Sequence, residues 1–76
     1  MISFKEFKKR CLKELVDERK ADDPEDLEKY LEEDDSVEIM EKFYKEGVER
    51  FKKNPNEKIA FGYCISTAAE NLSLLY

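Results

Sequence analysis

The sequence predicts an all-α fold, a small four-helix bundle, on three observations. Apolar residues recur at intervals of three and four, as they do on one face of a helix. Cap and proline signals divide this pattern into four segments. Of the nineteen acidic and fourteen basic residues, only Glu70 lies within residues 59–76. Because the charged helices or a second copy of the chain must cover such an apolar segment, we expect it to be the central helix of one domain, residues 1–76.

The first predicted helix covers residues 3–20. Ser3 and Glu6 have the spacing of a capping box, and Ile2 before the cap can pack against Phe7 as a hydrophobic staple. The apolar residues that follow share one face of the helix, with charged residues opposite. This apolar face comprises Phe4, Phe7, Cys11, Leu12 and Leu15.

The second predicted helix covers residues 24–34. Asp23 is the expected cap, and Pro24 suits the first helical position because its fixed φ is helical and no N–H is needed there. We expect this helix to lie outside the core and to be the least stable, since its apolar stripe is narrow. The stripe consists of Leu27, Tyr30 and Leu31.

The third predicted helix covers residues 36–53 and is the most clearly amphipathic. Asp35 and Glu38 have capping-box spacing at its start. Gly47 lies inside the apolar arc, which predicts that another helix crosses closely there, although a hinge is the alternative. The arc comprises Val37, Met40, Phe43, Tyr44, Gly47, Val48 and Phe51.

The fourth predicted helix covers residues 55–74, with Asn54 as its cap and Pro55 at its first position. The short link predicts that the third and fourth helices form an αα-hairpin. Small residues at 62, 66 and 73 form a strip where another backbone could approach. The expected core face comprises Phe61, Cys64, Ile65, Ala68, Ala69, Leu72, Leu75 and Tyr76.

Three apolar residues of the fourth helix, Ile59, Tyr63 and Leu74, lie beside Glu70 between the core face and the small strip. We take them as candidate contacts beyond the hairpin. The sequence leaves two ways in which these side chains can be covered. Either an earlier helix of the same chain packs on them, or they form a homodimer interface.

Net negative charge is concentrated around the second helix. One interpretation is a solvated helix with acids near its N-terminus. The other is a docking surface for a basic partner, or a DNA mimic, because nine carboxylates on a helix of about 16 Å match the nine or so charges of duplex DNA over that length. The candidate contacts are Asp22, Asp23, Asp26, Glu28, Glu32 and Glu33, and the run also includes Glu25, Asp34 and Asp35.

We expect no enzymatic activity, cofactor or metal site. The chain has no histidine, which removes the commonest general base and transition-metal ligand, and it has no calcium-loop pattern. Cys11 and Cys64 lack metal-site or CxxC spacing, so buried reduced thiols are expected rather than a disulfide or a reactive centre. Nucleic-acid binding through basic clusters near Lys9, Lys13 and Arg50 is a third alternative, opposed by the net charge of −5.

The expected location is the cytoplasm, without membrane insertion. Charge begins at Lys5, too early for the apolar stretch of a signal peptide. Glu70 would cost about 2.5 to 3.5 kcal/mol near the middle of a membrane span. The expected function is therefore a noncatalytic protein–protein interaction or regulatory module that can self-associate, with no family resemblance to name its partner.

Overall fold

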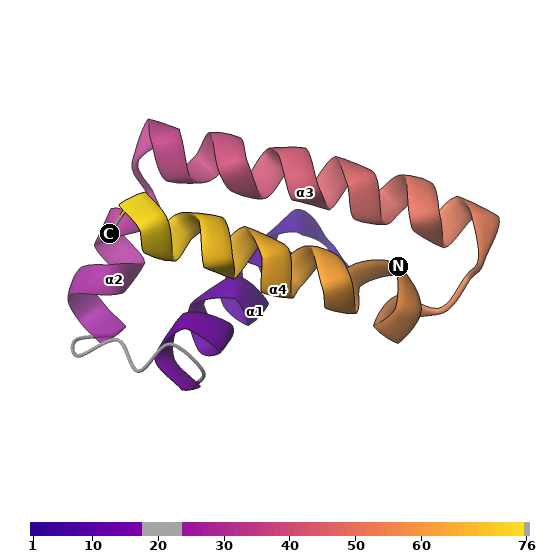
Figure 1. Cartoon of the computed structure of the whole chain (residues 1–76), viewed down its shortest axis with the longest axis horizontal. Coiled ribbons are helices and arrows are strands. Elements are labelled where there is room, and N and C mark those ends of the chain that lie inside the picture. The colour runs from indigo at the N-terminus through magenta and orange to yellow at the C-terminus, as the bar shows by residue number, and fades with distance from the viewer. Residues whose placement is uncertain (18–23, 76) are drawn as a thin grey trace.

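The computed structural model describes residues 1–17 and 24–75, and this part of the chain is all-α. Its helices are α1 (Phe4–Asp17), α2 (Pro24–Tyr30), α3 (Asp34–Lys53) and α4 (Glu57–Leu75), with no strand among the described residues (Figure 1). The predicted fold class is confirmed. Helices α3 and α4 run antiparallel as the expected hairpin and share the largest helix–helix contact.

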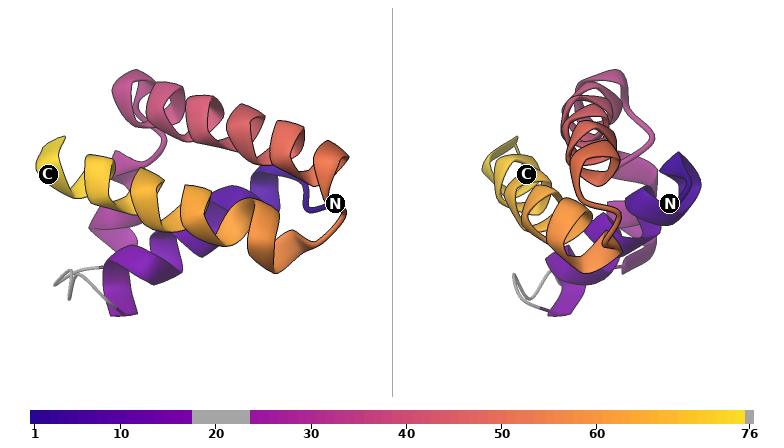
Figure 2. Two further views of the ribbon diagram at one scale, coloured as in Figure 1. Left: turned by 45° about the vertical axis from the view of Figure 1, so that its right-hand side comes forward. Right: turned by 90° about the vertical axis from the view of Figure 1, so that its right-hand side faces the viewer.

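Helix α4 contributes the most buried residues to the core, because it packs on α3 along one side and on α1 along another, whereas α2 packs mainly on α1 (Figure 2). Six residues of its predicted core face are buried, namely Phe61, Cys64, Ile65, Ala68, Ala69 and Leu72. Leu75 was predicted wrongly, since it is 51% exposed at the last residue of α4, where the core ends. Ala60 is fully buried although it was not predicted, and Tyr76 lies outside the described residues.

The first helix begins as its sequence predicts. The N–H of Glu6 donates to Ser3 Oγ at 3.1 Å, so Ser3 is the cap and Phe4 the first helical residue. Ile2 and Phe7 on either side of the cap are both buried, in agreement with the staple. The helix is described to Asp17, and the predicted extension to residue 20 lies outside the described residues.

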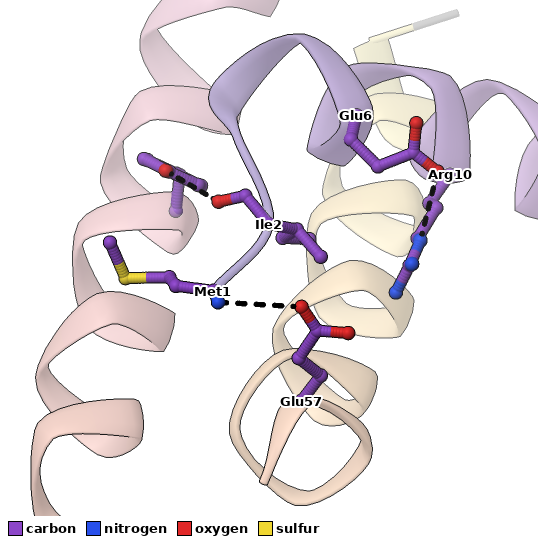
Figure 3. A network of polar contacts seen from close by, with 6 residues as sticks. Met1, Ile2, Glu6, Arg10 and Glu57 are labelled. Atoms are coloured by element: carbon purple, nitrogen blue, oxygen red, sulfur yellow. Dashed lines mark hydrogen bonds and ion pairs between the residues drawn. The ribbon is translucent and has the colours of Figure 1, made fainter. Parts of the chain in front are cut away.

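The N-terminal segment is held against the hairpin by two polar contacts (Figure 3). Tyr44 Oη of α3 donates to the carbonyl oxygen of Ile2 at 2.8 Å. The amino group of Met1 lies 3.6 Å from Glu57 Oε1 at the start of α4. The second contact is an exposed ion pair and contributes little, so the buried Ile2 side chain and the Tyr44 bond dominate.

The predicted cap of α3 is wrong. The helix begins at Asp34, with Glu33 in extended conformation before it and no hydrogen bond from the Glu33 side chain. Asp34 and Asp35 therefore lie in the first turn, where the helix dipole favours carboxylates. Ser36 lies on the same side of α3 as the buried residues Met40 and Gly47. It is fully buried beside the core, and its Oγ has no hydrogen-bond partner in the described structure.

The predicted cap of α4 is also wrong. Asn56 rather than Asn54 caps this helix, because its Oδ1 accepts the N–H of Ile59 at 3.2 Å. Asn54 instead ends α3, with its N–H donated to the carbonyl of Arg50 at 3.0 Å. Since the residue before a proline is held in extended conformation, Pro55 separates the two asparagines into a C-cap and an N-cap.

Gly47 marks the closest approach between α3 and α4, as its position in the apolar arc predicts. A Cβ built on Gly47 would lie 2.5 Å from Cδ1 of the Phe61 ring. The same ring stacks on Tyr44 at 5.8 Å between centroids and lies 6.3 Å from Phe7 and 6.2 Å from Phe51. The missing side chain at position 47 therefore makes room for the centre of an aromatic cluster.

We expect Gly47→Ala to lower the free energy of unfolding by about 1–2 kcal/mol, because overpacking against Phe61 outweighs the gain of about 1 kcal/mol in helix propensity. Gly62→Ala is the matched control. A Cβ at Gly62 meets nothing within 4 Å, so this substitution should raise stability by about 1 kcal/mol. Urea unfolding followed by circular dichroism at low protein concentration measures both. Equal stabilisation by the two alanines would contradict the role of the Phe61 contact.

Candidate interaction surfaces

The three apolar candidates of α4 are exposed to solvent. The exposed fractions are 59% for Ile59, 58% for Tyr63 and 80% for Leu74. Neither α1 nor α2, as the structure describes them, covers these side chains. Coverage by an earlier helix of the same chain is therefore wrong for the described residues.

Helical geometry explains their exposure. Residues 59, 63, 66, 70 and 74 follow one another at intervals of three or four and so share one side of α4. Helices α3 and α1 occupy the other sides, and in the right-hand panel of Figure 2 α4 forms the outer edge of the group. We call this side the α4 outer face and define it by its exposed residues, which are Ile59, Gly62, Tyr63, Ser66, Glu70 and Leu74.

The α4 outer face carries one charge, Glu70, whereas the exposed surface of the neighbouring helix α3 is densely charged. The exposed residues of α3 include Glu38, Glu41, Lys42, Lys45, Glu49 and Arg50. A surface helix is normally apolar on its inner side and charged on its outer side. Helix α4 departs from this rule on its outer side.

The middle of the α4 outer face is recessed, because the side chains at Gly62 and Ser66 are small. No helix crosses Gly62, so the close backbone approach predicted for the small strip does not occur within the described residues. The Oγ of Ser66 donates to Glu14 Oε1 of α1 at 3.5 Å. A shallow hollow between α1 and α4 is lined there by Arg10, Lys13, Glu14, Gly62 and Ser66.

Arg50 of α3 borders this face and was not predicted to belong to it. Its guanidinium lies 4.8 Å from the centroid of the Tyr63 ring, a cation–π distance, and its Nη2 lies 3.0 Å from Glu46 Oε1. The predicted hairpin of α3 and α4 could have indicated this contact, because residues of the two helices at similar distances from the link lie side by side. Arg50 thus lies against the Tyr63 ring and places a cation at the edge of the outer face.

The acidic candidates do not lie on one helix. Asp22 and Asp23 are outside the described residues, Asp26 is exposed near the start of α2, and Glu28, Glu32 and Glu33 are exposed further along. Helix α2 has seven residues, or about 10 Å, so residues 32–35 belong to the following turn and to α3. The expected match to nine or so DNA charges along one helix is therefore wrong in its geometry. The acidic candidates that the structure describes are nevertheless all exposed to solvent.

The basic cluster of α1 shares a groove with these acids. A hollow of about 220 Å³ between α1 and α2 has Lys5, Lys8 and Lys9 on one side and Glu28 and Glu32 on the other. Carboxylates within the same groove reduce its attraction for phosphate. This arrangement disfavours a cationic nucleic-acid surface, although the lysines and glutamates of the groove form no ion pair with one another among the described residues.

The two thiols lie in the core rather than at a site. Cys11 and Cys64 are buried and are not joined in a disulfide. Burial, assisted by the nearby charge of Glu14, raises the pKa of Cys11 from 9.0 to about 12, and burial also raises the pKa of Cys64. Both thiols are therefore kept in the protonated, weakly nucleophilic form.

The described residues contain no group of three or more cysteine, aspartate or glutamate side chains placed to hold a metal ion. None of the described helices combines the length and the apolar character required to cross a membrane.

No protein-family model, curated protein or solved structure matches this chain. Its functional interpretation therefore depends on its own surfaces.

The raised pKa of Cys11 predicts a loss of stability in alkali. Above pH 9 the thiol ionises in the unfolded chain but stays protonated in the folded one. The contribution of Cys11 to the free energy of unfolding is therefore complete below pH 9 and decreases up to about pH 12. At pH 10.5 we expect a loss of about 2 kcal/mol from this group, measured as the difference between wild type and Cys11→Ala in urea unfolding at pH 8 and pH 10.5. A pH dependence that is the same in both proteins would contradict it.

Proposed function

We propose that this protein is a noncatalytic protein–protein interaction module and that the α4 outer face is its binding surface. The observation that carries the proposal is the exposure of Ile59, Tyr63 and Leu74 on a helix side with one charge. Covering such a surface is favourable by roughly 25 cal/mol per Å² of apolar area removed from water.

The residue types of this face suit binding. Tyrosine and arginine are enriched where interfaces derive most of their energy, because both combine a large contact area with hydrogen-bond donors. Arg50 lies against the Tyr63 ring, so a partner that covers Tyr63 would also contact a cation. A partner would present apolar groups to Ile59 and Leu74 and a polar group to Tyr63.

The acidic residues around α2 are a second candidate binding surface, for a basic protein segment. Its support is that Glu28, Glu32 and Glu33 are all exposed, and no ion pair within the described residues involves them. A basic partner would relieve the repulsion among these like charges. Nucleic-acid binding through α1 has less support because Glu28 and Glu32 line the same groove as its lysines.

Photocrosslinking tests the α4 outer face. A photoreactive phenylalanine analogue replaces Tyr63 in one variant and Lys45, on the exposed side of α3, in the control. Irradiation of cells that express each variant should give an adduct from position 63 and none from position 45. Adding Ile59→Lys to the first variant should reduce its adduct several-fold. Adducts from both positions, or from neither, would contradict the proposal.

Charge removal tests the acidic surface. We expect Glu28→Gln/Glu32→Gln/Glu33→Gln to weaken binding of a fluorescent decalysine peptide on the order of tenfold at low salt, with the difference shrinking as salt rises. The matched control is Glu38→Gln/Glu41→Gln/Glu49→Gln, which removes the same charge from exposed positions of α3. Equal weakening by both triple variants would show that net charge alone governs the binding.

A further inference from the structure

We infer that the occupant of the α4 outer face is the same face of a second copy of this chain, packed antiparallel about a twofold axis between Ser66 and Thr67. This inference depends on the proposed function, since it names the partner of the same surface. A twofold dimer requires a self-complementary surface. Each contact between two different residues then occurs twice, once on each side of the axis. The spacing of the residues on α4 meets that requirement.

The apolar residues pair with each other in this arrangement. Ile59 lies seven residues before Ser66, and Leu74 lies seven residues after Thr67. An antiparallel copy therefore places Leu74 opposite Ile59 at both ends of the interface. These are two of the most exposed large apolar side chains in the described chain, so each end of the interface buries an apolar pair.

The polar residues also pair. Tyr63 lies three residues before Ser66 and Glu70 three residues after Thr67, so the same axis brings Glu70 of one copy to Tyr63 of the other. The Tyr63 hydroxyl can then donate to the carboxylate. Arg50, with its guanidinium 4.8 Å from the Tyr63 ring centroid, stands beside the arriving carboxylate. A guanidinium has five N–H donors, so Arg50 can bind this carboxylate while keeping Glu46.

The centre of the face allows the two helices to approach. Ser66 is exposed at the axis, and the space above Gly62 is open to at least 4 Å. Packed helices need axes about 8–10 Å apart, and small residues at the crossing give the shorter end of this range. Because one helix face is a small interface, we expect a dimer that dissociates in the micromolar range.

Charge exchange tests the inference on the full chain. Sedimentation equilibrium over a roughly hundredfold concentration range should show a reversible monomer–dimer equilibrium. Arg50→Glu sets two carboxylates against each other, and Glu70→Arg sets two cations. Each substitution should raise the dimer dissociation constant on the order of tenfold or more. The double variant Arg50→Glu/Glu70→Arg should restore dimerisation, which a loss of folding in either single variant could not explain.

A mixture of the two single variants gives the sharpest result. In a heterodimer of Arg50→Glu with Glu70→Arg, both cation–carboxylate pairs are formed again, so the mixture should dimerise although each variant alone is mostly monomeric. Lys45→Glu and Glu41→Arg are controls of the same charge changes on the exposed side of α3 and should leave the dimer unchanged. A strictly monomeric wild type, or a mixture no more associated than its components, would overturn the inference.

The two proposals fail differently. A position-63 crosslink of twice the chain mass supports the second copy as occupant. A crosslink to another protein, together with a monomeric wild type, retains the binding face and overturns the homodimer. No crosslink and no dimer would overturn both.

Discussion

The contact between Gly47 and the Phe61 ring is the constraint on which the rest of the structure depends. The ring lies where the side chain of residue 47 would be, and it contacts Tyr44, Phe7 and Phe51 around it. Three of the four helices that the structure describes therefore meet at one aromatic side chain. Because the ring is buried on all sides, it also fixes the rotation of α4 about its own axis. Any rotation of the helix would move the Phe61 ring out of the space beside Gly47.

The same constraint determines which side of α4 stays outside. With Phe61, Ala68 and Leu72 directed inward, residues on the opposite side of the helix can only face solvent or a partner. The exposure of Ile59 and Tyr63 is thus a consequence of core packing and not of a loose helix end. The protein has many charged residues, yet this fixed outer side carries only Glu70.

Periodicity predicted the helices, the hairpin and most of the core, because burial of an apolar face is a property of helical spacing alone. It also predicted that Gly47 lies at a close crossing. The caps of α3 and α4 were predicted wrongly because several residues that can cap a helix lie near each boundary. At the start of α4, for example, both Asn54 and Asn56 can do so. The hairpin brings Arg50 and Tyr63 to similar distances from the link, but their contact was not predicted, because it also depends on the relative rotation of the two helices. That rotation follows from packing around Phe61, which no local pattern encodes.

Glu70 has a specific part in the proposed dimer. In a parallel pair of α4 helices, each residue would lie near its own copy, so the two Glu70 carboxylates would face each other with little solvent between them. In the antiparallel pair each carboxylate instead meets Tyr63 and Arg50. Like charges brought together across an interface cost several kcal/mol, whereas opposite charges select partner and orientation. An uncharged residue at position 70 would bury more apolar surface but would leave the two orientations closer in energy. The single charge on the α4 outer face therefore supplies orientation, while Ile59 and Leu74 supply most of the affinity.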